Sequence, residues 1–402
     1  MQLNRKTKWF LAVNAMWSLA ANFAHPITPT VIKDLGLGDY MFGVALSCMM
    51  TANFLFSPFW GKINGYISSR VSLLICNLGY ALGQFLFMMA RTELHVGIAR
   101  FVAGIFCGGC MVSMLTYIVN TSTEDNRGQA LTVQATLQAV CSAFGFMIGG
   151  LLGEISVNTA FMAQVVALST AGVLFFLVGE NDATQERGAL SGKVFFKEVN
   201  PFSAFLSSRK FMTVLLAVLF AITALQNLGF TSYEQGVNYY IKDQFGFSSA
   251  YNGLLKGAIG ITSLIANSTL CLWLLRRTDT RRSLAVLYAV CTAALLSGLW
   301  LHSFGLFAVG NLLYFASNAV SLPLLQGLIA DRAQGEHRNL VMGFYNAMKS
   351  LGGIIGPLTV GFLYLAWPRV IFVFAGCAYL LGTVCAVVYY RMMKKREKAG
   401  QL

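Results

Sequence analysis

Charged side chains are scarce in this chain. They make up 11% of its 402 residues, whereas soluble domains carry about 25%. Histidine occurs only 4 times, and the four positions do not show metal-ligand spacing. The sequence also lacks a nucleophile elbow and a phosphate-binding loop. These absences argue against a soluble domain, a metal site and an enzyme, and we expect no cofactor.

Acidic residues are particularly few, with 16 Asp and Glu against 29 Lys and Arg and a net charge of +13. Such an excess can indicate a nucleic-acid partner, but the predicted loops on one side of the chain carry 22 of the 29 basic residues. Only Lys33, Arg91, Lys242 and Arg369 fall in loops on the other side. The positive-inside rule therefore predicts a multi-pass protein of the cell membrane with both termini in the cytoplasm. The basic run at 276–282 predicts contact with anionic lipid rather than nucleic acid.

Hydrophobic residues are abundant, at 56% of the chain. They form continuous runs of roughly twenty residues, which is long enough to cross a bilayer core of about 30 Å. We predict an all-α integral membrane protein with twelve transmembrane helices. The predicted ranges are 8–31, 40–60, 71–91, 94–119, 129–152, 158–179, 211–240, 252–275, 283–303, 305–330, 340–366 and 369–391.

The chain also repeats itself. Arg127 matches Arg338 at a spacing of 211 residues, and the tripeptide Ile-Lys-Asp occurs at 32–34 and again at 241–243. Other pairs at the same 211-residue spacing are Gly145 and Gly356, Gly150 and Gly361, Arg70 and Arg281, and Ser72 and Ser283. We predict two pseudo-symmetric six-helix bundles, 1–179 and 211–402, joined by a polar cytoplasmic linker at 180–210. Duplicated membrane halves are typical of secondary transporters, whose substrate site lies between moving parts.

Several local motifs resemble those of the major facilitator superfamily, and the resemblance covers essentially the whole chain. Residues Arg100–Gly104 resemble the R-x-x-x-G motif of that family, and the loop Glu124–Gly128, with Arg127, matches another common pattern. The segment Gly61–Arg70 occupies the place of the G-x-L-a-D-r-x-G-r-k motif, but Gly65 stands where the family has an acid. The resemblance implies that Gly61, Arg70 and Arg127 belong to conformational motifs.

Two glycine-rich segments are most similar to the drug:proton antiporter branch with twelve helices. Gly145–Gly150, including Gly149, resembles the G-P-x-x-G-G motif, although Phe146 stands in the place of the proline. The segment Gly356–Gly361 is a better copy, because it retains Pro357. Small residues let helices approach closely, and this suits a hinge or a sliding interface.

An ionisable group inside a membrane helix needs a partner or a function. Lys349 is predicted near the midplane of its helix, and its repeat mate Gln138 has Gln134 one turn earlier on the same face. We predict that these three residues contact a small-molecule substrate, with structural pairing of Lys349 as the alternative. Further predicted contacts are Arg100, Tyr345, Asn311 and Asn227, for which ordinary packing is the alternative.

Glu234 and His25 each precede an Ile-Lys-Asp tripeptide by seven residues and are therefore repeat mates in the outer third of the membrane. A carboxylate and an imidazole at that depth are suited to loading a proton from outside. The family resemblance implies a role in proton coupling for Arg100 as well. The alternative for Glu234 and His25 is a position at a wetted entrance, and the alternative for Arg100 is packing against lipid headgroups.

The sequence thus predicts a secondary transporter, driven by an ion gradient of protons, that moves a small molecule by alternating access. Export of small amphipathic compounds is favoured, and transport of an organic anion or another polar metabolite is the first alternative. A membrane sensor or scaffold that binds a ligand without moving it is the alternative of another class. We expect the protein to act as a monomer in contact with membrane lipid.

Overall fold

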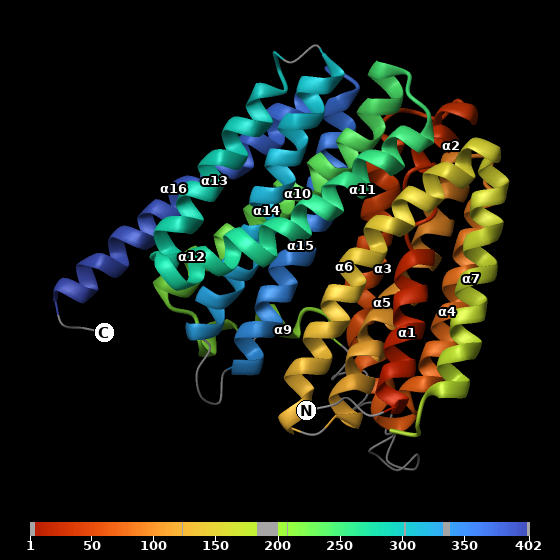
Figure 1. Ribbon diagram of the computed structural model, residues 1–402, viewed down its shortest axis with the longest axis horizontal. Coiled ribbons are helices and arrows are strands. Elements are labelled where there is room, and N and C mark those ends of the chain that lie inside the picture. The colour runs from red at the N-terminus through yellow and green to blue at the C-terminus, as the bar shows by residue number, and fades with distance from the viewer. Residues whose placement is uncertain are drawn as a thin grey trace. The chain divides into compact units, whose positions relative to one another are not determined.

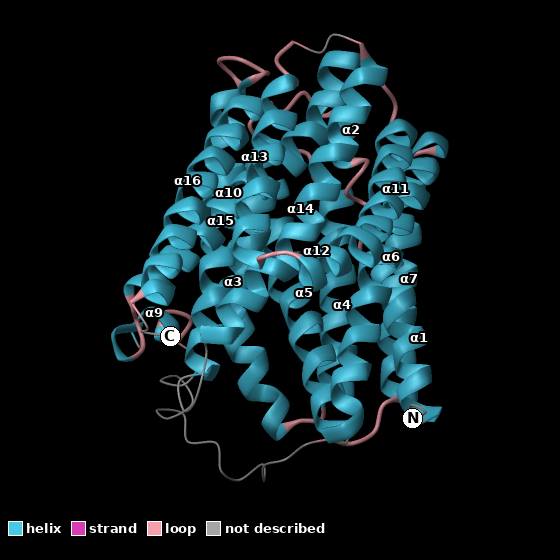
Figure 2. Cartoon of the chain, turned by 60° about the vertical axis from the view of Figure 1, so that its left-hand side comes forward, coloured by secondary structure: helices cyan, strands magenta, loops and turns pink. Residues whose placement is uncertain are grey.

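The computed structural model describes residues 5–122, 124–182, 200–206, 208–300, 303–332 and 338–399. Within these ranges the regular structure is helical throughout (Figure 2). The helices up to residue 178 are α1 (Arg5–Ala20), α2 (Thr28–Asp34), α3 (Met41–Tyr66), α4 (Ser69–Met88), α5 (Glu93–Thr121), α6 (Glu124–Ile155) and α7 (Val157–Val178).

Two short elements, α9 (Ser203–Leu206) and the 3₁₀ turn η2 (Ser208–Lys210), precede the second set of helices. That set consists of α10 (Val214–Phe245), α11 (Ser249–Ala266), the π-helical turn η3 (Asn267–Cys271), α12 (Leu272–Arg277), α13 (Thr280–Ser297), α14 (Phe304–Arg332), α15 (Arg338–Tyr364) and α16 (Val370–Lys398). Figure 1 shows their order along the chain.

The predicted all-helical membrane fold is confirmed. Each predicted segment is helical, although 8–31 and 252–275 each contain more than one element. Nine helices in the described part are long and apolar enough to span a membrane. The outward faces are apolar as well. On α4 the exposed side chains Ile75, Leu78, Leu82 and Phe85 follow helical spacing. In a bilayer, such a stripe faces lipid rather than water.

The segment predicted at 8–31 is divided into two helices, because the chain turns between α1 and α2. Pro26 and Pro29 lack the N–H groups that a continuous helix would require at these positions. The Thr28 hydroxyl donates to the carbonyl of Ala24 at 2.8 Å and so satisfies an acceptor within the turn. Side-chain bonds of this kind let a membrane segment tolerate a break in its helix.

The chain forms two compact units. The first contains residues 1–41, 48–201 and 241–257, and the second contains 42–47, 202–240 and 258–402. The units therefore differ from the two repeat halves, because 241–257 of the second half belongs to the first unit and 42–47 of the first half belongs to the second unit. The predicted division at a linker over 180–210 stays a prediction, and residues 183–199 of that linker lie outside the described ranges.

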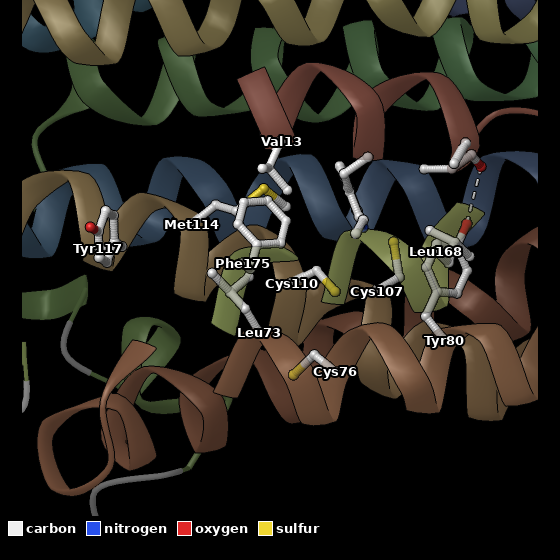
Figure 3. Packing of buried hydrophobic residues seen from close by; sticks show 14 of the residues in the cluster. Val13, Leu73, Cys76, Tyr80, Cys107, Cys110, Met114, Tyr117, Leu168 and Phe175 are labelled. Atoms are coloured by element: carbon white, nitrogen blue, oxygen red, sulfur yellow. Dashed lines mark hydrogen bonds between the residues drawn. The ribbon is translucent and has the colours of Figure 1, made fainter. Parts of the chain in front are cut away.

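The core of the first unit lies between α1, α4, α5 and α7 (Figure 3). Phe10 stacks on Tyr117 with ring centroids 3.9 Å apart and also contacts Phe175. Cys107 and Cys110 are both buried in this cluster as free thiols. The three-residue spacing of these cysteines therefore places two small side chains in the buried packing of α5.

Candidate functional site

Lys349 lies near the middle of α15 in the second unit, and its side chain is partly buried. Its Nζ is 5.6 Å from the ring centroid of Tyr345, which is buried one turn earlier. No hydrogen bond or ion pair to Lys349 occurs among the residues that the structure describes. The ring face attracts the ammonium but does not neutralise its charge. Lys349 is therefore an interior cation with capacity for an anionic or hydrogen-bonding ligand.

Asn311 and Asn227 have different surroundings in the same unit. Asn311 on α14 is only 2% exposed, and it accepts a hydrogen bond from the Tyr233 hydroxyl at 3.0 Å. Its amide nitrogen donates to the Phe307 carbonyl at 2.9 Å, so both ends of the side chain are engaged. Asn227 on α10 is partly buried and donates to the Thr223 carbonyl within its own helix.

A buried polar network connects α10, α14 and α16, and sequence reasoning missed most of it. Gln226 donates to Asn318 and to Ser321 at 3.1 Å each, and the Tyr379 hydroxyl donates to Asn318 at 2.6 Å. Tyr314 extends the network through its bond to the Tyr379 hydroxyl. Asn318 lies seven residues after Asn311, and this spacing on one helix face is the signal that was available in the sequence.

In the first unit Arg100 is a deeply buried cation, at 4% exposure. Its Nη2 donates to the Thr28 hydroxyl at 2.8 Å, and its guanidinium lies 4.1 Å from the centroid of Phe87. The Nε atom has no hydrogen-bond partner in the described part of the chain. The broken helix that contains Thr28 thus presents its hydroxyl to a charge on α5.

His25 and Lys256 both contact a single aromatic ring. The His25 imidazole stacks on Phe146 with centroids 5.6 Å apart, and Lys256 Nζ lies 5.3 Å from the same ring centroid. Phe146 is the residue that replaces the proline of the family motif. The departure from the motif therefore provides one aromatic ring that contacts both His25 and Lys256.

Gln134 and Gln138 lie one turn apart on α6 in the first unit, and Gln134 is the more buried of the two. Glu234 is half-buried on α10 in the second unit, directly after Tyr233. The proposed substrate and proton residues are therefore distributed over both units, as the repeat predicts. Their roles stay predictions.

The glycine motifs form close backbone contacts. A Cβ atom at Gly145 would collide with the carbonyl oxygen of Leu19 on α1, and one at Gly149 would collide with that of Phe23. At Gly150 it would lie 2.5 Å from the Ser249 carbonyl oxygen. The α6 backbone therefore lies directly against its neighbours, at distances that only glycine permits.

The second motif makes the corresponding contact on α15. A Cβ atom at Gly356 would lie 2.5 Å from both the Leu228 carbonyl oxygen and the Ser232 hydroxyl of α10. One helix turn from Gly361, the Pro357 carbonyl faces Gly43 of α3, where a Cβ atom would also collide. Both motifs thus place helix backbones in contact at repeat-equivalent positions.

The loop after α3 obtains a carboxylate from a distant part of the sequence. Asp182, which follows α7, accepts hydrogen bonds from the backbone N–H and the hydroxyl of Ser69, both at 2.6 Å. Arg70 Nη1 donates to the Gly179 carbonyl at 3.3 Å. Gly61 on α3 has only an ordinary van der Waals neighbour. Asp182 therefore provides a carboxylate at the start of α4, close in sequence to the motif position where Gly65 carries none.

Arg127 and its repeat mate Arg338 begin α6 and α15, but their side chains lie outside the described part of the structure. Three other charged residues, Lys33, Asp39 and Asp243, are joined by ion pairs. Lys33 Nζ contacts Asp243 at 2.5 Å and Asp39 at 3.0 Å, all within the first unit. The basic residue of one Ile-Lys-Asp copy thus pairs with the acid of the other.

Comparison with known proteins identifies the family. Residues 10–321 and 299–401 match the Major Facilitator Superfamily. Tetracycline resistance protein, class C, of Escherichia coli is 26% identical over 373 residues, which cover 90% of each chain. Multidrug resistance protein 1 of Bacillus subtilis (strain 168) is 21% identical over 374 residues, covering 90% of this chain and 91% of that protein.

Solved transporters share the fold at low sequence identity. The nucleoside transporter NupG aligns with a TM-score of 0.75 and 14% identity, over 96% of this chain and 100% of that one. The human organic anion transporter MFSD10 aligns with a TM-score of 0.69 and 18% identity over the same shares. This chain belongs to the Major Facilitator Superfamily and is a multi-pass membrane transporter of small molecules rather than an enzyme.

Proposed function

We propose that the protein exports small amphipathic compounds across the cell membrane by proton-driven alternating access. The observation that carries this proposal is the pair of glycine contacts at repeat-equivalent positions, Gly145 against Leu19 and Gly356 against Leu228. Helices in direct backbone contact can slide or rock without repacking large side chains. The names of the relatives, which are tetracycline and multidrug resistance proteins, favour export and an amphipathic substrate.

The proposed arrangement in the membrane follows from the distribution of charge. Both termini and the basic loops lie in the cytoplasm, and the protein acts as a monomer surrounded by lipid. Protease protection of a C-terminal tag in sealed vesicles of known orientation tests this assignment. Protection in inside-out vesicles contradicts it.

Lys349 contacts the substrate in this proposal, with Gln138, Gln134 and Arg100 as further contacts. Lys349→Ala should lower the transport rate at least about tenfold, because a hydrogen bond to a charged group contributes about 1.5–3 kcal/mol. Transport is measured in proteoliposomes at matched protein abundance. Near-normal flux with unchanged specificity would assign Lys349 a packing role.

Lys394→Ala is the matched control for this measurement. Lys394 Nζ lies 5.7 Å from the Tyr390 ring centroid, close to the geometry of Lys349 over Tyr345, but Lys394 is exposed near the end of α16. The control removes an equal charge and an equivalent cation–π contact outside the membrane interior. Transport by this variant should match the wild type.

Glu234, together with His25 and Arg100, carries the proton coupling in this proposal. Glu234→Gln removes the titratable group at nearly constant volume, and accumulation driven by a pH gradient should be lost while downhill flux continues. Both fluxes are measured in the same vesicles, with Glu397→Gln as a control on a carboxylate that pairs with Arg281 at the end of α16. Intact coupling in Glu234→Gln would place the proton site elsewhere.

Transport of an organic anion is the second candidate. The ammonium of Lys349 favours it, because this interior charge has no acidic partner within the described ranges. A competition panel of lipophilic cations, tetracycline and aromatic carboxylates separates the two candidates. Preference for carboxylates, lost in Lys349→Ala, would support the anion. Saturable binding without flux of any of these compounds would instead indicate a sensor.

A further inference from the structure

An open groove in the second unit contains none of the candidate transport residues in its lining. It encloses about 620 Å³ beside α12, α13 and α16. Its apolar lining consists of Leu270, Leu274, Val286, Leu287 and Tyr390. This volume falls within the range of about 300–1,000 Å³ that is usual for small-molecule sites. The groove is therefore large enough for a substantial part of a lipid molecule.

A local change in helix geometry contributes to the groove wall. The helix that begins as α11 widens into the π-helical turn η3, and Leu270 lies within that turn. The Thr269 hydroxyl donates to the Ile265 carbonyl at 2.6 Å, and the Ser268 hydroxyl donates to the Leu264 carbonyl at 2.9 Å. Bonds of this type accompany bends in helices, and π-helical turns occur frequently at functional positions.

The apolar part of the groove is open on its outer side. Leu270 is 41% exposed and Val286 is 55% exposed, whereas Leu287 at the back is buried. An apolar wall with its outer side chains exposed can contact an acyl chain along its length.

Two basic residues line the same groove at the turn between α12 and α13. Arg277 and Arg282 are both exposed, and neither forms an ion pair or hydrogen bond within the described ranges. The nearby acid is already engaged, because Asp279 accepts bonds from the backbone N–H and the Nε of Arg281 at 2.9 and 3.0 Å. The groove thus combines an apolar wall with two cations that the described part of the chain leaves uncompensated.

We propose that this groove binds an anionic phospholipid. The phosphate group lies between Arg277 and Arg282, and an acyl chain follows Leu270, Leu274 and Val286. Arginine is well suited to the headgroup because its planar guanidinium donates paired hydrogen bonds to phosphate oxygens. The apolar wall distinguishes this ligand from free phosphate, and the positive charge of the two arginines favours an anionic over a zwitterionic headgroup.

Native mass spectrometry of the purified full chain tests the proposal. The protein is titrated with dioleoylphosphatidylglycerol, dioleoylphosphatidylcholine and inorganic phosphate in separate experiments. The wild type should retain phosphatidylglycerol in preference to phosphatidylcholine. The double variant Arg277→Gln/Arg282→Gln should bind phosphatidylglycerol roughly tenfold or more weakly, because each basic residue near an anionic lipid contributes about a fivefold increase in affinity.

Two further variants make the test specific. Arg276→Gln/Arg391→Gln removes the same charge at exposed residues next to Arg277 and Tyr390 that do not line the groove, and its affinity should match the wild type. Val286→Trp fills the groove but keeps both arginines, and it should also lose phosphatidylglycerol. Thermal unfolding of every variant verifies that it is folded.

Several outcomes would overturn the proposal. These are equal phosphatidylglycerol binding by the wild type and Arg277→Gln/Arg282→Gln, unchanged binding by Val286→Trp, and equal retention of phosphatidylcholine. Displacement of phosphatidylglycerol by an equal concentration of inorganic phosphate would identify a simple anion site in place of a lipid site. None of these results depends on the transported substrate, so the lipid site and the proposed transport function are tested separately.

Discussion

One carboxylate accepts hydrogen bonds at the start of each of the repeat-equivalent helices α4 and α13, but the two carboxylates do not occupy equivalent sequence positions. At the start of α13, Asp279 caps its own helix by accepting a bond from the Arg281 N–H. The residue at the matching repeat position, Ser68, makes no such bond at the start of α4. Asp182 replaces it there and also accepts a bond from Asn120 Nδ2 at 3.2 Å. A carboxylate therefore accepts hydrogen bonds at the start of both helices, from a different place in the sequence in each half.

Asp182→Asn should destabilise the first unit. An amide offers one acceptor oxygen in place of two and no charge to favour the helix N-terminus, so one buried donor around Ser69 or Asn120 loses its partner. The expected loss is about 1–3 kcal/mol of unfolding free energy. Thermal unfolding in detergent measures it as a lower Tm.

Glu180→Gln is the control for this variant, because Glu180 pairs with Lys6 at 2.6 Å through partly exposed side chains. Solvent screens a surface pair of this kind, so it contributes little to stability. An equal decrease in Tm for Asp182→Asn and Glu180→Gln would show that the three bonds to Asp182 add nothing specific.

At the scale of the helix, glycines let α6 and α15 lie with their backbones directly against neighbouring segments. Gly352 and Gly356 of α15 both face the backbone of α10, where Cβ atoms would lie 2.6 Å and 2.5 Å from carbonyl oxygens. A Cβ atom at the exposed Gly343 of the same helix would have no neighbour within 4 Å among the described residues. The packing of α15 therefore requires glycine at Gly356, whereas Gly343 has room for a larger side chain.

Gly356→Ala and Gly343→Ala should therefore have opposite effects. Alanine favours a helix over glycine by about 0.5–1 kcal/mol, so Gly343→Ala should raise the Tm. In Gly356→Ala the new methyl group forces α15 away from Leu228 and Ser232, at a cost of about 1–3 kcal/mol. The transport rate, measured beside the Tm, should fall only in Gly356→Ala, and a rise in Tm for both variants would contradict the close contact.

At the scale of the molecule, the sequence predicted what local patterns encode. Continuous apolar runs predicted the membrane helices, and the 211-residue repeat predicted the transporter class. The bond between Ser69 and Asp182 joins residues 113 apart, and no spacing rule predicts it. The network around Gln226, Asn318 and Tyr379 likewise depends on how three helices pack, which single-sequence periodicity does not determine.

The repeat also explains the ion pair between its two Ile-Lys-Asp copies. Lys33 of the first copy contacts Asp243 of the second, at 2.5 Å. Partial burial works to lower the pKa of Lys33, but hydrogen bonds and charge from Asp243 and Asp39 outweigh it, so the pKa lies above the ordinary lysine value. The contact therefore stabilises the folded state fully below the ordinary lysine pKa, and its contribution is lost as the pH rises through the raised value.

Exchanging the two charges tests whether this pair holds the segments 28–40 and 241–247 together. Lys33→Asp and Asp243→Lys alone should each speed backbone hydrogen–deuterium exchange in these segments at neutral pH, because each places like charges together. The double variant restores opposite charges and should recover most of the protection. Lys242→Asp, next to the pair in the second tripeptide, changes the charge by the same amount as Lys33→Asp and is the control. The double variant differs from the two single variants only in restoring opposite charges at residues 33 and 243. Exchange as fast in the double variant as in the single variants would therefore mean that the ion pair does not hold these segments together.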